Sequence, residues 1–281
     1  ERVDEALTQR EIATAADLSV GTVNRAMADL HERGFVREGM LSAAGLEALE
    51  PYRVKRAVLI AAGFGSRLVP ITLNTPKPLI RVQGRRIIDS LLDAVYAAGI
   101  EEGYVVRGYL AEQFDQLLYK YPGLKFIENP FYNEANNISS AVAAKDLLQN
   151  AYVFESDLLL YNPKLITKYQ YSSNYLGVPV QVTDDWCFQT RRGVITGLSV
   201  GGTDCHHMFG ISYWTEEDGR KLADDVPATF AMPGGKERYW DEVALRYFAR
   251  NYEVVVRECT FDDVIEIDTY RELQELDKAY V

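Results

Sequence analysis

The sequence predicts an α/β fold with a mainly parallel, Rossmann-like mixed sheet, preceded by a small winged-helix domain. An apolar run at residues 57–62 is short enough for a buried parallel strand and breaks into a loop with two glycines. Strand and helix patterns alternate beyond this run, which is typical of a parallel sheet covered on both faces. The segment before the run has helical patterns instead. We therefore expect two domains, residues 1–52 and 53–281, with the linker near Tyr52.

The elements of the larger domain follow from the spacing of apolar residues. In its first half the expected helices and strands cover residues 87–98, 103–107, 111–120, 124–128, 138–148 and 151–154. Beyond Pro163 apolar and polar residues alternate, which predicts antiparallel strands at residues 176–182, 186–190, 193–200 and 207–214. The last expected elements are a helix over residues 239–250, a strand over 252–257 and a closing helix over 269–278.

Composition is that of an ordinary globular protein. The chain has 281 residues, of which 47% are hydrophobic and 25% charged, and its longest apolar runs are far too short to span a membrane. The N-terminus is charged rather than signal-like, and three scattered cysteines suit a reducing compartment. We expect a cytoplasmic protein without membrane insertion. A net charge of −11 opposes nonspecific nucleic-acid binding by the whole chain.

The N-terminal segment has the pattern of a helix-turn-helix. Ser19 stands where it would cap the second helix, and residues 35–41 would form a two-stranded wing. This pattern resembles the winged-helix domains of bacterial regulators, which implies that a helix over about residues 20–33 enters the DNA major groove. Residues 1–56, however, carry eight Lys and Arg against ten Asp and Glu, a poor electrostatic footprint for DNA. This charge balance favours a docking or dimerisation module, with DNA as the alternative partner of residues 1–52.

The loop after the apolar run is suited to binding phosphates. Gly63 and Gly65 permit backbone angles closed to other residues, so that successive N–H groups can face one anion. Arg67 offers a fork of donors for phosphate oxygens, and prolines stiffen the following segment, which carries Lys77. A dinucleotide fingerprint does not fit, because Leu68 stands where its third glycine would be. We therefore predict a polyphosphate site.

Several motifs resemble those of known nucleotidyltransferases. The signature of the enzymes that make sugar and alcohol nucleotides resembles Ala61-Ala62-Gly63-x-Gly65-x-Arg67-Leu68-x-Pro70-x-Thr72 with Pro76-Lys77-Pro78-Leu79. Bacterial CTP:phosphocholine cytidylyltransferases are similar in Gly108-Tyr109-Leu110-x-Glu112-Gln113-Phe114, Tyr132-x-x-x-Asn136-Asn137-x-x-Ser140, Tyr239-Trp240-Asp241 and Glu266-Ile267-Asp268. The likeness covers roughly residues 55–281. It implies a sheet of the nucleotidyltransferase type and a Mg²⁺-dependent transferase that joins CMP from CTP to phosphocholine, giving CDP-choline and pyrophosphate.

The resemblance also implies roles for particular residues. It makes Arg67 and Lys77 catalytic, because they would neutralise charge on the phosphates. It assigns nucleotide binding to Ala62, Gly63, Gly65, Ser66, Arg67, Asn136, Asn137 and Ser140. Asn136 and Asn137 each donate and accept hydrogen bonds, as reading a base edge requires, although an asparagine before a helix is equally well explained as a cap.

Three acidic residues are candidate metal ligands. Asp157 follows an expected strand, and ligand crevices lie beyond the carboxyl ends of strands in open α/β sheets. Alternation along residues 264–268 places Glu266 and Asp268 on one face. Carboxylates suit a hard cation, so we predict that Asp157, Asp268 and Glu266 bind Mg²⁺. The alternatives are a turn residue and a solvated strand face.

Aromatic and acidic residues are candidates for binding the acceptor. Choline carries a quaternary ammonium group, which aromatic faces and carboxylates recognise. The resemblance places Trp186, Tyr239, Trp240 and Asp241 beside the acceptor. Two alternatives stay open. The acceptor could instead be an aminoalkylphosphonate or a sugar 1-phosphate, with Trp186 and Tyr239 in the core, or the protein could be a DNA-binding regulator whose nucleotidyltransferase-like domain senses a ligand.

Overall fold

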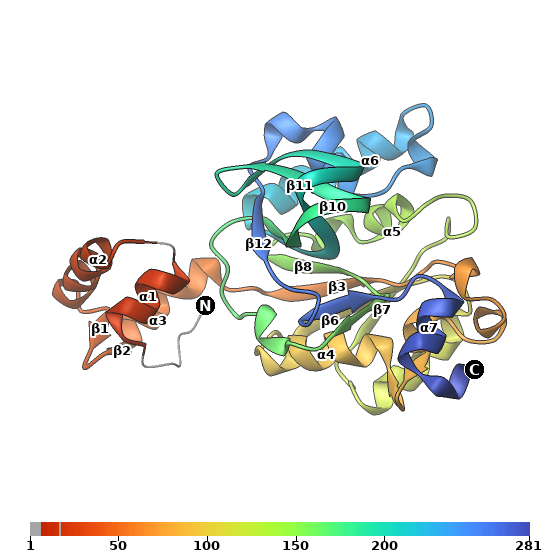
Figure 1. Cartoon of the computed structure of the whole chain (residues 1–281), viewed down its shortest axis with the longest axis horizontal. Helices are drawn as coiled ribbons and strands as arrows, with labels where there is room; N and C mark the ends of the chain where they lie inside the picture. Colours follow the sequence, from red (N-terminus) through yellow and green to blue (C-terminus); the bar gives the residue numbers. More distant parts are fainter. Residues whose placement is uncertain (1–6, 17) are drawn as a thin grey trace. The chain divides into compact units, whose positions relative to one another are not determined.

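The computed structural model describes residues 7–16 and 18–281, which fall into two compact units that meet between Arg53 and Val54. Residues 1–6 and 17 of the expected N-terminal domain lie outside the described residues. The helices and strands of both units are labelled in Figure 1. None of the described helices is long and apolar enough to cross a membrane.

The first unit is a winged helix-turn-helix, as the sequence predicts. Its elements are α1 (Gln9–Ala15), α2 (Val20–Glu32), β1 (Val36–Arg37), β2 (Met40–Leu41) and α3 (Ala43–Leu49). Ser19 caps α2 because its hydroxyl accepts a hydrogen bond from the Thr22 N–H. The two strands pair in an antiparallel wing. The buried apolar side chains of this unit are small: Ala13, Val23 and Val36.

The second unit is built on a seven-stranded mixed sheet in the order β10-β12-β11-β8-β3-β6-β7. Its parallel strands are β3 (Arg56–Ile60), β6 (Glu102–Arg107), β7 (Lys125–Glu128) and β8 (Ala151–Glu155). On the other side lie β10 (Asn174–Arg191), β11 (Val194–Trp214) and β12 (Val255–Glu258), and β11 pairs antiparallel with β8. This arrangement confirms the predicted mainly parallel sheet.

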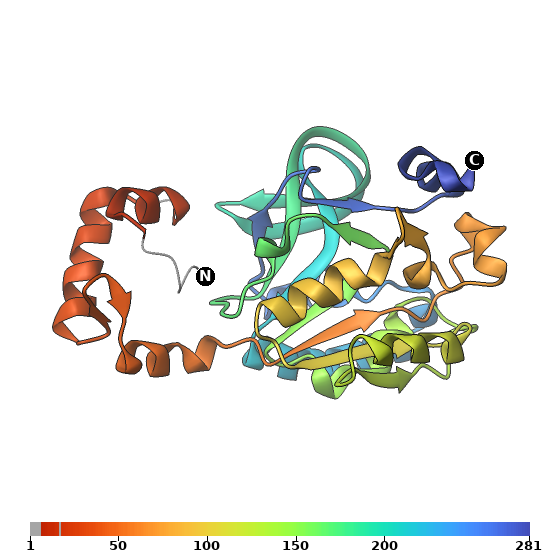
Figure 2. The ribbon, with the colours of Figure 1, turned by 90° about the horizontal axis from the view of Figure 1, so that it is seen from below.

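Helices cover both faces of this sheet (Figure 1). The helix α4 (Ile87–Ala97) runs along one face, as Figure 2 shows from below, while α5 (Ile138–Ala143) and α6 (Glu216–Ala231) cover the other. After its first residue, Arg56, the central strand β3 is apolar because both of its faces are buried there. Leu59 packs in the same cluster as α4, and Val58 packs with Ala144 beyond the end of α5.

Two short antiparallel ribbons and a capped helix complete the unit. The ribbons are β4 (Arg81–Val82) with β5 (Arg85–Arg86), and β9 (Leu158–Leu160) with β13 (Val264–Glu266). The predicted closing helix is α7 (Tyr270–Leu276), which begins with a capping box between Thr269 and Glu272. The β9–β13 pairing brings the C-terminal carboxylates beside the end of β8.

Three expectations about the elements are corrected. The four predicted antiparallel strands are two long strands, β10 and β11, whose paired register shifts at bulges. The helix predicted over residues 111–120 is a 3₁₀ helix, Ala111–Tyr119. The helix predicted over residues 239–250 is replaced by a π-helical turn, Val243–Tyr247, and a 3₁₀ turn, Ala249–Asn251. Helix α6 was not predicted, because it contains Pro227, which ordinarily ends a helix.

Gly219 lets α6 pack directly on another backbone segment, which leads to a stability prediction. A Cβ at Gly219 would lie 2.5 Å from both the Cα of Gln149 and the carbonyl oxygen of Leu148. Gly219→Ala should therefore lower the free energy of unfolding by about 1–3 kcal/mol in chemical denaturation. Gly123→Ala is the control, because a Cβ there meets open space. Equal stability of the two variants would contradict this packing.

Candidate active site

One cavity of about 520 Å³ lies at the carboxyl ends of the parallel strands. Every site residue predicted from the sequence lines it, with the exception of Trp240. The cavity thus brings together the glycine loop, the two predicted cations, the acidic residues and the aromatic residues, which are far apart in the sequence.

The glycine loop is held in a conformation that requires Gly65. This residue has φ +62°, and a Cβ there would lie 3.0 Å from Thr72 Cγ2 and 3.1 Å from Lys77 Cβ. The Thr72 hydroxyl donates a hydrogen bond to the Gly65 carbonyl at 2.9 Å. At Gly63, by contrast, a Cβ meets nothing and φ is ordinary. The conformational freedom of glycine is therefore used at the second position of the loop.

The two predicted cations are both bound to Asp268. Arg67 donates two parallel hydrogen bonds to the Asp268 carboxylate, at 2.8 and 2.7 Å. The Lys77 ammonium donates to Asp268 at 3.0 Å and to Asp157 at 2.8 Å. Burial lowers the pKa of Lys77, but the two carboxylates more than offset it, so the pKa is raised and the ammonium stays charged. Burial likewise opposes ionisation of Asp268, yet Lys77 and Arg67 hold its pKa below the usual value.

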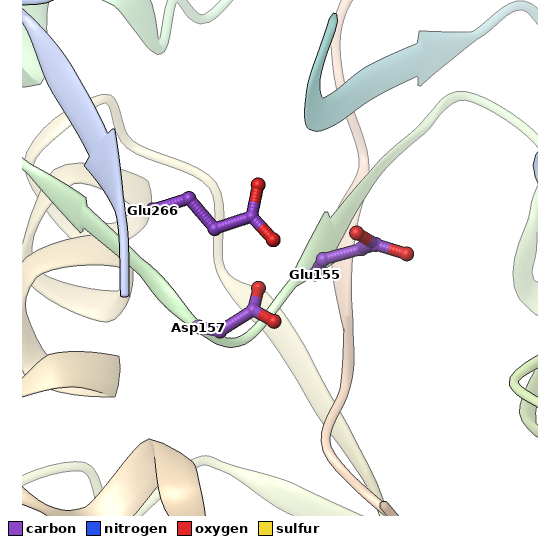
Figure 3. A group of neighbouring side chains, drawn as sticks. All are labelled: Glu155, Asp157 and Glu266. Carbon is purple, nitrogen blue, oxygen red and sulfur yellow. The ribbon is translucent and has the colours of Figure 1, made fainter. Parts of the chain in front are cut away.

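Three carboxylates form a cluster that could hold a metal ion. Glu155, Asp157 and Glu266 each offer one oxygen, and these oxygens lie within 4.8 Å of one another. Figure 3 shows the three side chains gathered at one place. Asp157 Oδ1 is buried and has no hydrogen-bond partner among the described residues. An all-oxygen donor set with an unpartnered acceptor fits a hard cation such as Mg²⁺.

This cluster differs from the predicted ligand set. Asp157 and Glu266 were expected, but Glu155 takes the place of Asp268, whose carboxylate is held by Arg67 and Lys77. The strand β13 ends at Glu266, so alternation along a strand does not place Asp268. The sequence did contain a signal for Glu155, because it stands two residues before Asp157 at the end of β8.

Burial raises the pKa values of two carboxyl groups in this cluster, which disfavours their negatively charged forms. The pKa of Glu155 is raised well above its usual value, first by burial and then by the neighbouring Asp241 and Asp157. Burial and the nearby Asp157 and Asp268 raise the pKa of Glu266 in the same way. A Cβ at Gly210 would lie 2.6 Å from Glu155 Cγ, so glycine is needed there to admit the Glu155 side chain.

The predicted base-reading residues make hydrogen bonds within the protein. Asn137 donates to Glu155 Oε1 at 2.8 Å, and its side-chain oxygen accepts the Trp240 N–H at 2.9 Å. Asn136 donates to the Glu237 carbonyl, while the Ser140 hydroxyl accepts from Asn129. No side chain caps α5, so the alternative of a helix cap is not supported at Asn137. The side chain of Asn137 instead links Glu155 of the carboxylate cluster to the backbone of the aromatic segment at Trp240.

The aromatic residues divide between the cavity and the core. Trp186 and Tyr239 line the cavity with ring centroids 5.4 Å apart and planes at 66°. Trp240 is a correction, because it packs against Trp214 and Tyr175 inside the core and does not line the cavity. Adjacent residues in this segment point in different directions, so Tyr239 and Trp240 cannot both face the cavity.

Asp241 lies in the cavity wall as a buried acid. The Tyr175 hydroxyl donates a hydrogen bond to its carboxylate at 2.7 Å. Burial raises the pKa of Asp241 to about 7, although the hydrogen bond from Tyr175 opposes the shift. Neither Asp241 nor Glu155 forms an ion pair with another described residue.

Comparisons with known proteins agree with this architecture. A family model described as nucleotidyl transferase matches residues 56–174, and one described as winged helix-turn-helix DNA-binding matches residues 2–37. The 2-aminoethylphosphonate cytidylyltransferase of Lancefieldella rimae is 35% identical over 80% of this chain and 93% of its own length. The choline-phosphate cytidylyltransferase of Streptococcus pneumoniae is 28% identical over 79% of this chain and 97% of its own length.

A solved structure of a cytidylyltransferase has a similar fold. The CTP:phosphocholine cytidylyltransferase from Streptococcus pneumoniae matches with a TM-score of 0.74 and 28% identity, covering 82% of this chain and 100% of that one. The sheet and its cavity are those of an enzyme that transfers nucleotidyl groups. The chain belongs to the nucleotidyl transferase family, and two of its relatives are cytidylyltransferases named for a phosphonate and for choline phosphate.

The buried carboxyl of Asp241 predicts a pH dependence of stability. Between about pH 4 and pH 7 the folded protein keeps the Asp241 proton while the unfolded chain has lost it, so this residue makes stability fall as pH rises through that range. Asp241→Asn cannot titrate and should lack this contribution of up to about 1.4 kcal/mol per pH unit. Denaturation of both proteins at pH 5, 6 and 7 measures the difference. Asp184→Asn, which removes an exposed carboxylate, controls for the change in net charge. Parallel profiles of stability against pH for the wild type and Asp241→Asn would contradict the prediction.

Proposed function

We propose that the protein transfers CMP from CTP to a small acceptor that carries a phosphonate or phosphate at one end and an ammonium group at the other, releasing pyrophosphate. One observation supports this proposal: the cavity holds two cationic side chains together with buried acids that form no ion pair with another described residue. Arg67 and Lys77 suit the phosphates, and Glu155 and Asp241 suit an ammonium group. An acceptor with both charges would complete the site.

We infer that the acceptor is an aminoalkylphosphonate, with 2-aminoethylphosphonate as the first candidate. Since Trp240 is in the core, the cavity offers two aromatic rings rather than three, which is a small cage for a quaternary ammonium. A primary ammonium donates hydrogen bonds, which the buried acids Asp241 and Glu155 accept. The relative that is 35% identical is named for this acceptor.

Phosphocholine, the acceptor predicted from the sequence, is the second candidate. The observation that favours it is the pair of rings, Trp186 and Tyr239, on the cavity wall. The relative that is 28% identical is named for choline phosphate. The two candidates differ in whether the cation is recognised by hydrogen bonds or by aromatic faces.

The chemistry requires positioning and charge neutralisation more than a general base. An anionic oxygen of the acceptor attacks the α-phosphorus in line, a new P–O bond forms, and the bond to the leaving pyrophosphate breaks. The attacking oxygen has already lost its proton, so none must be removed. Lys77 and Arg67 would stabilise the charge on the phosphates. Mg²⁺ held by Asp157 and Glu266 would add further neutralisation when bound.

A substrate panel tests the proposal. Pyrophosphate release is measured with Mg²⁺ and CTP or UTP against 2-aminoethylphosphonate, phosphocholine and glucose 1-phosphate. We expect kcat/KM to be highest with CTP and 2-aminoethylphosphonate, by at least about tenfold over phosphocholine, because only the primary ammonium donates to the buried acids. Preference for phosphocholine would select the second candidate. Turnover with the sugar phosphate alone would contradict the ammonium site.

Lys77 should matter for turnover much more than for folding. Lys77→Met keeps the apolar stem and removes the charge, and we expect kcat/KM to fall by about 100-fold or more, whereas the variant still folds because Arg67 continues to pair with Asp268. Lys145→Met is the matched control, since Lys145 is on the surface and pairs with Asp146. A Lys77→Met enzyme with near wild-type turnover would remove Lys77 from the catalytic machinery.

A further inference from the structure

Asp268 is paired with both of the cationic side chains that a triphosphate would need. Its carboxylate binds Arg67 through both terminal nitrogens and Lys77 through the ammonium. The Arg67 side chain is 65% exposed and that of Lys77 only 11%, so one cation lies at the surface of the cavity and the other inside. One carboxylate therefore ties together the outer and the inner cation.

The same donors cannot serve Asp268 and a triphosphate at once. Each guanidinium or ammonium hydrogen that points at Asp268 is unavailable to a phosphate oxygen. The cavity also holds the acids Asp157, Glu155 and Glu266, and those that are ionised repel a polyanion until a metal ion neutralises them. In the arrangement seen here, the cavity presents its acids to a nucleotide and keeps its cations paired.

We propose that Asp268 exchanges partners: it gives up Arg67 and Lys77 when a divalent metal ion binds beside Asp157, and the two released cations then bind the triphosphate. This inference rests on the proposed function, since it takes CTP as the nucleotide. The exchange couples the two ligands, so metal tightens CTP binding and CTP tightens metal binding by the same factor. Asp268 is thus a positioning residue for the cations as well as a candidate metal ligand.

Asp157 provides the matched comparison. It carries the same charge and contacts Lys77, but it makes no hydrogen bond to Arg67, and one of its oxygens is unpartnered among the described residues. Asp157→Asn therefore removes a negative charge while Asp268 still holds both cations. Asp268→Asn removes the same charge and releases them. The two variants separate partner exchange from simple relief of repulsion.

The experiment is calorimetric titration of the full chain with CTP, without acceptor, first in EDTA and then with Mg²⁺. For the wild type we expect Mg²⁺ to tighten CTP binding at least tenfold. In EDTA, Asp268→Asn should bind CTP at least fivefold more tightly than wild type, and Asp157→Asn less than twofold. In an Arg67→Gln background the gain from Asp268→Asn should be clearly smaller, because Lys77 is then the only one of the two cations left to be released. Thermal melts confirm that each variant is folded.

The outcomes are distinct. Equal tightening by Asp268→Asn and Asp157→Asn would overturn the exchange, and so would an undiminished gain in the Arg67→Gln background, because either result is explained by charge alone. Wild-type CTP binding that is the same with and without Mg²⁺ would also overturn it. Absence of CTP binding in the wild type with Mg²⁺ present would overturn the proposed function and this inference with it.

Discussion

The balance of charge at the carboxyl ends of the strands is the constraint on which the site depends. Glu155, Asp157, Glu266 and Asp268 line one cavity together with the cations Arg67 and Lys77. Burying a charge is costly unless the charge is paired, and the acids of this cavity avoid an unpaired buried charge in two ways. Asp157 and Asp268 pair with the cations, whereas burial raises the pKa values of the two glutamates well above the usual range. The acids that lack a cation are then suited to cations brought by ligands.

The topology explains how these groups meet. The glycine loop follows β3, while Glu155 ends β8 and Asp157 follows it. These groups lie side by side because β3 and β8 are neighbouring parallel strands. The β9–β13 ribbon then returns the C-terminal segment to the same point, and the Ile267 N–H donates to the Asp157 carbonyl. Arg67 and Asp268, which are 201 positions apart, thus line one cavity because the backbone pairing brings their segments together.

Local signals predicted much of this from the sequence. The apolar run before a glycine loop predicted β3 and the Ser19 cap predicted α2, and the loop, Lys77 and Asp157, which were expected at one site, line one cavity. What failed depends on long-range packing. The sequence cannot show that Trp240 turns into the core beside Trp214, or that the Asp268 carboxylate pairs with both Arg67 and Lys77. Helix α6 was hidden because tertiary packing tolerates Pro227 in its interior.

The central claim is that this cavity binds a triphosphate through its cations and a metal ion through its carboxylates. The most direct measurement is a crystal structure of the full chain with CTP and Mn²⁺, in which anomalous scattering locates the metal. The account predicts an anomalous peak beside Asp157, with Arg67 and Lys77 in contact with phosphate oxygens. A triphosphate bound outside the cavity, or bound inside it with Arg67 still paired to Asp268, would contradict the account.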